Sequence, residues 1–369
     1  GWSNLSEGLR RLGRLNEAVE ASRKALSLKP DNADACNNLG NALKEQGNLD
    51  DAIASYRKAL MLKPDYANAN YNLGNALKDQ GRHDDAIASY RKTLSLKPDY
   101  AEAHNNLGIA LQEQGHLDDA IASYREAVTL KPDYAEAYNN MGASLKDQGH
   151  LDNAIDCYRK ALALTPDYAQ AYYNLGNALK GIVVRAPAPD ISDLILKLLE
   201  KEKFVRPKNV SKAAISLLKF DPIIISVLKK QSSGNLLDSL QEIIVGLSKV
   251  PLLLKLMEIC PLPDLAFEGV VKKLRSEILL NISDIKYNSE ILTFQIGLAL
   301  QCFTNEYLYD QTDVETEALK ELENLIENKL TDGEQPTPAE LACLASYKAL
   351  HEYSWLHLLS IPVELKALQ

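Results

Sequence analysis

Cysteine is scarce in this sequence, and no two cysteines form a short-range pair. The five thiols lie far apart inside helical patterns, with no CxxC spacing and an odd total. Folds that depend on disulfides, and sites that hold zinc, need cysteines in closely spaced pairs. The sequence therefore predicts reduced, partly buried thiols in a cytoplasmic protein, at Cys36, Cys157, Cys260, Cys302 and Cys343.

A surplus of positive charge is also absent. Lys and Arg number 41 against 50 Asp and Glu, the formal net charge is -9, and no basic cluster is visible. Proteins that bind nucleic acid neutralise phosphates with Lys and Arg gathered on one face. No stretch approaches the ~20 apolar residues that a membrane-spanning helix requires. We therefore expect neither a nucleic-acid partner nor a membrane partner.

Catalytic and cofactor motifs are missing as well. The sequence has no GxGxxG, no P-loop, no GxSxG and no HExxH. His351 and His357 are six residues apart, a spacing that does not place two metal ligands on one helical face. The paired acids Asp50 and Asp51 stand at the expected start of a second helix, where the first of them can cap free amides. We predict no catalytic residue, no metal ligand and no cofactor within this chain.

What the sequence does contain is a repeat of 34 residues, clearest from Ala101 to Tyr134. Copies in the same phase span residues 33–66, 67–100, 101–134 and 135–168, with a degenerate copy over 1–32 and a half copy over 169–180. Each copy carries two amphipathic helices, and Gly47 and Pro64 are placed to end them. A fixed period of this length is typical of a helical solenoid, so the predicted fold class is all-α.

Small and large residues alternate in a fixed pattern within each copy. Gly40 and Ala52 are small because two helices must approach closely where they cross, and Tyr56 fills the space beside them. In the copy that starts at Ala101 the pattern reads Leu107, Gly108, Leu111, Ala120, Tyr124, Ala127 and Pro132. It resembles the tetratricopeptide repeat (TPR), which implies a right-handed superhelix. Ser6 and Ser22 depart from it, in place of the glycine and the tyrosine of the first copy.

The repeats stop after residue 180, where the composition changes. Residues 181–190 contain two prolines and are typical of a linker. Further helices without internal repetition are predicted at 236–248, 252–259, 263–280, 289–309 and 314–330, with a last pair at 339–351 and from there to about residue 359. We therefore predict a solenoid of five helix pairs plus a final helix over 1–180, a linker over 181–190, and a helical domain over 191–369.

Asparagine occupies the sixth place of every copy. First helices of such repeats line the inner wall of the superhelix, so these amides would form a ladder that binds the backbone of an extended peptide through donor and acceptor. A similar ladder is a feature of O-linked N-acetylglucosamine transferases, which this half resembles. The candidate peptide-binding residues are Asn38, Asn72, Asn106, Asn140 and Asn174, with Asn37, Tyr71, Asn105, Asn139 and Tyr173 beside them. The alternative is that the asparagines brace neighbouring helices or recur only through duplication.

The second half carries a different resemblance. FQIGLALQCFTNEYLYDQT at 294–312 and LACLASYKALHEYSWL at 341–356 are similar to the helical region before the catalytic domain of bacterial repeat-containing methyltransferases that use S-adenosylmethionine. Two functions therefore stay open. The chain is a scaffold that binds protein or peptide segments in an asparagine-lined groove, or it is the substrate-recruiting and linker region of a larger transferase, a methyltransferase rather than a glycosyltransferase. Whether the parent protein is an enzyme stays open with them.

Overall fold

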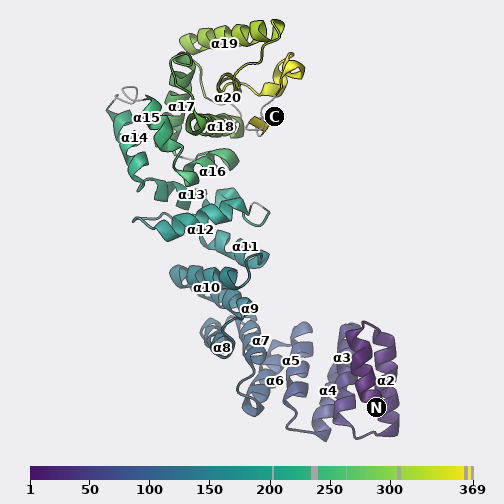
Figure 1. The fold of residues 1–369 in the computed structure, drawn as a ribbon. Coiled ribbons are helices and arrows are strands. Elements are labelled where there is room, and N and C mark those ends of the chain that lie inside the picture. The colour runs from purple at the N-terminus through teal and green to yellow at the C-terminus, as the bar shows by residue number, and fades with distance from the viewer. Residues whose placement is uncertain (202, 234–239, 263, 306–308, 361–364, 367–369) are drawn as a thin grey trace. The chain divides into compact units, whose positions relative to one another are not determined.

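The computed structural model describes residues 1–201, 203–233, 240–262, 264–305, 309–360 and 365–366. Within these residues the chain is helical, without strands, and divides into two compact units, Gly1–Ala178 (unit 1) and Leu179–Gln369 (unit 2). The predicted all-α class is confirmed, and unit 1 is the predicted solenoid of helix pairs (Figure 1).

Unit 1 alternates first and second helices along the chain. The first helices are α1 (Trp2–Arg11), α3 (Ala33–Glu45), α5 (Ala67–Asp79), α7 (Ala101–Glu113), α9 (Ala135–Asp147) and α11 (Ala169–Ala178). The second helices are α2 (Leu15–Leu28), α4 (Leu49–Leu62), α6 (His83–Leu96), α8 (Leu117–Leu130) and α10 (Leu151–Leu164). Each second helix packs on the first helix of its own pair and on the first helix of the next pair. Each helix pair therefore stabilises mainly the pairs next to it, as expected of a solenoid.

A glycine and a tyrosine fix the distance between the two helices of each of the four pairs from α3–α4 to α9–α10. Tyr124 on α8 is fully buried against Gly108 on α7, and a Cβ at Gly108 would lie 2.6 Å from Cε1 of Tyr124. The same close approach joins Gly40 to Tyr56, Gly74 to Tyr90 and Gly142 to Tyr158. Atoms in a packed interior do not come so near, so only glycine fits at these places.

The turn inside each pair depends on a second glycine. Gly47 adopts a left-handed backbone, with φ at 82°, directly after α3. Its N–H donates to the carbonyl of Lys44 at 2.9 Å, and the N–H of Asn48 donates to the carbonyl of Leu43 at 2.9 Å. These two bonds satisfy the free carbonyls at the end of the helix. The predicted role of Gly47 is confirmed, and it brings α4 back alongside α3.

The first helices lie next to one another along one face of unit 1. Each first helix contacts the first helix of the next pair, whereas consecutive second helices make fewer such contacts. In a curved stack the elements on the concave side approach one another more closely than those on the outside. We therefore call the surface presented by α1, α3, α5, α7, α9 and α11 the inner face.

Unit 2 is a non-repetitive helical assembly. It contains α12 (Pro189–Glu200), α13 (Pro207–Leu218), α14 (Pro222–Ser232), α15 (Leu240–Leu247), α16 (Pro251–Ile259), α17 (Leu265–Leu280), α18 (Ser289–Thr304), α19 (Asp313–Thr331) and α20 (Pro338–Ala345). Five of these helices begin with proline, which suits the first helical position because its missing N–H would have no partner there. For the same reason α12 already begins at Pro189, inside the stretch expected to be a linker.

The last predicted helix pair is wrong in its extent. The helix α20 ends at Ala345 and is followed by two short 3₁₀ turns, Leu350–Glu352 and Leu356–Leu358. Just after α20, the hydroxyl of Ser346 donates to the carbonyl of Cys343 at 2.6 Å, a local bond that competes with continued helix. Two other predicted helices begin at residues 236 and 263, and these starting residues lie outside the described ones.

A buried ion pair joins α17 to α19 in unit 2. Arg275 and Glu315 are 1% and 2% exposed, with Nη2 of the arginine 3.6 Å from Oε1 of the glutamate. Oε1 also accepts from the hydroxyl of Tyr347 at 2.8 Å, and Oε2 accepts from the backbone N–H of Thr312 at 3.0 Å. Burial alone would raise the pKa of Glu315, but the hydrogen bonds from Thr312 and Tyr347 and the charge of Arg275 outweigh it and lower this pKa.

The described helices include none that is long and apolar enough to cross a membrane. All five cysteines are buried and free, and burial raises the pKa of the Cys157 and Cys260 thiols to about 11. These thiols are therefore protonated near neutral pH and pack as small apolar groups.

Candidate functional site

The candidate site is the row of asparagines at the sixth place of the first helices. Their side chains are half-buried between neighbouring first helices, at Asn38 on α3, Asn72 on α5, Asn106 on α7, Asn140 on α9 and Asn174 on α11. Asn4 on α1, the equivalent residue in the first copy, is exposed. The row therefore runs across the inner face from one first helix to the next.

Each of these five amides donates to the preceding first helix. Nδ2 of Asn72 donates to Oδ1 of Asn37 at 3.0 Å, and Nδ2 of Asn140 donates to Oδ1 of Asn105 at 3.2 Å. The other rungs of this ladder are Asn38 to Oγ and the carbonyl of Ser3, Asn106 to Tyr71 and Asn75, and Asn174 to Asn139. The asparagines thus brace neighbouring first helices, as the alternative interpretation proposed.

The residues beside the row fall into two groups. Asn37, Asn105 and Asn139 are buried, with 5%, 0% and 3% of their surface exposed, and each accepts from the next rung. A peptide on the surface cannot reach them, so we assign these three to the brace and not to peptide contact. Tyr71 is half-buried: its ring lies 4.8 Å from that of Tyr100, and burial raises its pKa. Tyr173, by contrast, is 54% exposed.

The carbonyl oxygens of the ladder differ along its length. Oδ1 of Asn106 accepts from Asn105 at 3.3 Å, that of Asn140 from Asn139 at 3.4 Å, and that of Asn174 from Gln170 at 3.1 Å. Throughout unit 1, every residue of which is described, Oδ1 of Asn38 and Oδ1 of Asn72 accept no hydrogen bond. These two atoms are therefore held in place by the brace and keep their acceptor capacity.

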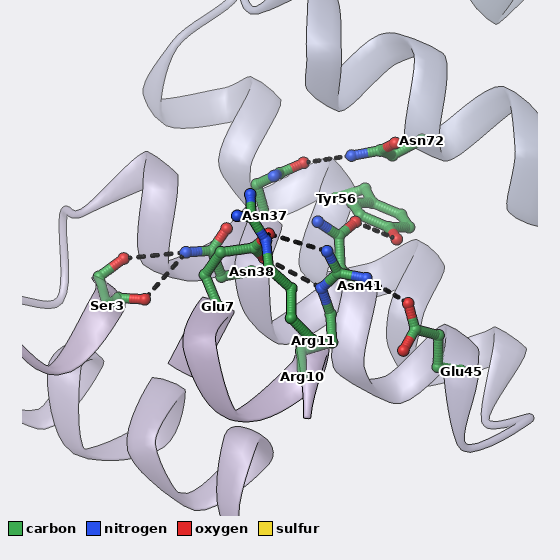
Figure 2. A network of polar contacts seen from close by, with 10 residues as sticks. All are labelled: Ser3, Glu7, Arg10, Arg11, Asn37, Asn38, Asn41, Glu45, Tyr56 and Asn72. Carbon is green, nitrogen blue, oxygen red and sulfur yellow. Dashed lines mark hydrogen bonds and ion pairs between the residues drawn. The ribbon is translucent and has the colours of Figure 1, made fainter. Parts of the chain in front are cut away.

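A polar pocket of about 520 Å³ opens at the α1 end of the row, between α1 and α3. Figure 2 shows the polar contacts beside it, among them the hydrogen bonds from Asn38 to Ser3. Asn4 and Asn38 both line the pocket. Glu7, also in its wall, receives hydrogen bonds from Arg10 at 3.0 and 2.8 Å and from Arg11 at 2.9 Å. The hydrogen bond from Arg10 is the largest of the effects that lower the pKa of Glu7. Arg10 also pairs with Glu45 on α3, so it links the two first helices beside the pocket.

A second ladder, on the turns between the helices, was missed in the sequence. Nε2 of Gln80 donates to Oδ1 of Asp50 in the preceding helix pair at 2.7 Å. The same bond joins Gln114 to Asp84 at 2.6 Å and Gln148 to Asp118 at 2.8 Å. Asp50 was expected to cap α4, but α4 already begins at Leu49, so Asp50 lies inside its first turn. The sequence could have revealed this ladder, because the glutamine and the aspartate recur together in successive copies.

One buried hydroxyl marks a place where the copies differ. The hydroxyls of Tyr56 and Tyr90 donate to Oδ1 of Asn41 at 2.8 Å and of Asn75 at 2.7 Å. The equivalent of these asparagines in the fifth copy is Ala143, and the buried hydroxyl of Tyr158 finds no partner among the described residues. Burying a hydroxyl without a hydrogen-bond partner costs about 1–3 kcal/mol of desolvation. The tyrosine of the pair α9–α10 is therefore less well satisfied in its hydrogen bonding than those of α3–α4 and α5–α6.

No three His, Cys, Asp or Glu side chains gather as metal ligands in the part of the chain that the structure describes. The arrangement in unit 1 therefore offers hydrogen-bond donors and acceptors together with a few charged groups.

Comparison with known proteins identifies the repeats. The family model of the TPR repeat matches residues 9–47, 40–81, 74–115, 113–149 and 144–182. Residues 9–182 are therefore tetratricopeptide repeats, as the sequence pattern predicted. No curated protein sequence matches the chain.

Several solved structures are similar to part of the chain. A crystal structure of MamA is 29% identical, covering 45% of this chain and 96% of MamA, with a TM-score of 0.42. YrrB, described as a TPR protein with an unusual peptide-binding site, is 24% identical over 46% of this chain and 88% of its own, with a TM-score of 0.41. A thermophilic TPR protein of Thermus thermophilus, TTC0263, is 23% identical over 48% of this chain and 97% of its own, with a TM-score of 0.40.

Proposed function

We propose that unit 1 binds an extended segment of another protein along its inner face. The observation that carries this proposal is the pair of open carbonyl oxygens on Asn38 and Asn72, which lie on successive first helices and are fixed by their own amide groups. An acceptor of this kind can take the N–H of any peptide backbone, so it needs no particular side chain on the partner.

The brace and the binding role support each other. A free asparagine side chain loses rotamer freedom when it binds a ligand, which reduces the affinity gained. Here Nδ2 of Asn72 is already tied to Asn37 at 3.0 Å, and Nδ2 of Asn38 is tied to Ser3 at 3.1 Å. These side chains therefore lose their rotamer freedom when the protein folds and not when it binds. The two oxygens are held at a fixed spacing before a peptide arrives.

Backbone contacts alone give weak binding. A net gain of about 1 kcal/mol for each hydrogen bond makes two such acceptors worth ~2 kcal/mol, below the roughly 4.1 kcal/mol that corresponds to a millimolar dissociation constant. Binding in the micromolar range therefore needs side-chain contacts as well. The exposed Tyr173 and the polar pocket beside Asn38 are the places on the inner face that can supply them.

A permanently unfolded protein tests the proposal. Reduced, carboxymethylated α-lactalbumin carries a fluorescent label and is titrated with the whole chain, and anisotropy reports binding. We expect saturable binding that falls at least about fivefold in the double variant Asn38→Ala and Asn72→Ala. The matched control is Gln80→Ala with Gln114→Ala. It also removes two hydrogen bonds between neighbouring helix pairs, but these bonds lie at the turns and not on the inner face.

Two outcomes would count against this function. One is no binding of the unfolded protein by the wild-type chain. The other is an equal loss of affinity in the glutamine control, because that result would trace the loss to a loosened solenoid and not to the asparagine oxygens.

The transferase alternative stays a prediction from the sequence of the second half. Unit 2 would then join the peptide-binding unit to a catalytic domain of the parent protein. The neighbouring coding sequence tests this: a Rossmann-like domain with a glycine-rich first turn would support methyl transfer.

A further inference from the structure

Charged side chains, and not only neutral polar ones, line the pocket between α1 and α3. Its lining includes two carboxylates, Glu7 and Asp34, and one guanidinium, Arg11. Glu7 is already neutralised, because Arg10 and Arg11 both donate to it (Figure 2). Asp34 makes no ion pair with any described residue. The unbalanced charge of the pocket is therefore that of Asp34.

Other acceptors lie close to this carboxylate. Asp34 and Asn38 are four residues apart on α3, and residues at this spacing are neighbours on one helical face. Burial and the neighbouring carboxylate of Asp34 raise the pKa of Tyr66, which also lines the pocket. Nζ of Lys63 lies 4.9 Å from the centre of the Tyr66 ring and forms no ion pair with Asp34. A carboxylate and the open Oδ1 of Asn38 thus face the same space.

We propose that this pocket takes a positively charged side chain, lysine or arginine, of the segment bound along the inner face. The inference rests on the proposed function, which supplies the backbone contact at Asn38 next to the pocket. A cationic group carries several N–H donors and satisfies the carboxylate of Asp34 and the oxygen of Asn38 together. An anionic side chain would meet the two carboxylates Asp34 and Glu7 beside a single lining cation, Arg11, whose Nε already donates to Glu7.

Gly8 supplies the means to close the pocket without disturbing the fold. It belongs to α1, lines the pocket, and a Cβ built on it meets no atom within 4 Å. A large side chain at this position therefore projects into open space. Gly8→Phe should fill part of the pocket and reduce binding of a cationic side chain there, and Gly8→Ala is its matched control.

Three labelled peptides test the proposal by fluorescence anisotropy with the whole chain. They are dodecapeptides of Gly, Ser and Ala that differ only at the central residue, which is Lys, Gln or Glu. We expect the Lys peptide to bind about fivefold more tightly than the Gln peptide at low salt, and the Glu peptide to bind least tightly. Asp34→Asn should remove most of the Lys preference, measured as the ratio of the affinities for the Lys and the Gln peptide. Asp133→Asn, an exposed aspartate in the turn before α9, is the control that should leave this ratio unchanged.

The outcomes separate this inference from the function on which it rests. If the Gln peptide binds and loses affinity in Asn72→Ala, but Lys, Gln and Glu peptides bind alike, the pocket proposal is overturned and the groove stands. A preference for the Glu peptide, or a Lys preference that survives Asp34→Asn, overturns it as well. Failure of all three peptides to bind would overturn the pocket proposal, whereas the groove is judged by the unfolded protein, whose affinity does not depend on a single side chain.

Discussion

Replacing Asn72 and Asn140 separately by alanine distinguishes bracing from binding within one ladder. Both side chains donate through Nδ2 to a buried asparagine of the preceding pair, Asn72 to Asn37 at 3.0 Å and Asn140 to Asn105 at 3.2 Å. Their oxygens differ: Oδ1 of Asn140 accepts from Asn139 at 3.4 Å, whereas Oδ1 of Asn72 accepts no hydrogen bond within unit 1. The two substitutions should therefore cost similar stability but different affinity.

The stability cost follows from the partner that is left behind. Each substitution strands the oxygen of a buried amide, at Asn37 or Asn105, which costs about 1–3 kcal/mol, and gains about 0.6 kcal/mol from the better helix propensity of alanine. A net loss of ~1–2 kcal/mol is expected in both variants.

The affinity cost follows from the open oxygen. Asn72→Ala removes an acceptor worth about 1 kcal/mol and should weaken binding of the unfolded protein about fivefold, whereas Asn140→Ala should change it less than about twofold. Urea unfolding followed by circular dichroism measures the first quantity, compared through midpoints because repeat arrays need not unfold in two states. Anisotropy measures the second. Equal affinity losses in the two variants, or unchanged midpoints in both, would refute the reasoning.

Three further predictions concern stability. Gly108→Ala should destabilise unit 1 by ~1–2 kcal/mol in urea, because its Cβ would meet Tyr124 at 2.6 Å, while Gly8→Ala, which meets nothing, should stabilise it by about 1 kcal/mol; similar midpoints for both would contradict the packing argument. Ala143→Asn should give the buried hydroxyl of Tyr158 an acceptor and raise the midpoint by the equivalent of about 0.5–1 kcal/mol, an effect that should vanish in a Tyr158→Phe background. Because the pKa of Glu315 is lowered in the folded state, its ionised form stabilises unit 2 above about pH 4.5, and this contribution is lost as the pH falls through the folded pKa. The melting temperature of Glu315→Gln should therefore fall less steeply with decreasing pH than that of the wild type. Equal slopes in the two proteins would count against the ion pair.

The sequence predicted what depends on short-range pattern. The helix pairs, the turn at Gly47 and the contact of Gly40 with Tyr56 all follow from spacing inside one copy, where period and residue size leave few arrangements. The end of α20 was not predictable in this way, because apolar residues recur in the sequence beyond Ala345, whereas in the structure the helix ends there and two short 3₁₀ turns follow.

The site was predicted only in part. The asparagine column was visible in the sequence, and its donors do reach between first helices. Oδ1 of Asn106 and Oδ1 of Asn140 accept from the asparagine in the fifth place, and Oδ1 of Asn174 accepts from Gln170. Asn37 stands in the same fifth place beside Asn38, whose oxygen stays open, so the repeat pattern alone does not tell which oxygens are free to accept. The pocket beside Asn38 requires two helices from different copies, so no single copy contains its pattern.

The bonds between successive copies also bear on how such a chain can lengthen. Gln80 reaches back to Asp50, Gln114 to Asp84 and Gln148 to Asp118, so one block of 34 residues brings a donor for the block before it and an acceptor for the block after it. A tandem duplication inside the array would join old and new blocks through the same contact with no accompanying substitution. Gene duplication can therefore change the reach of this surface in whole blocks while every junction keeps its chemistry.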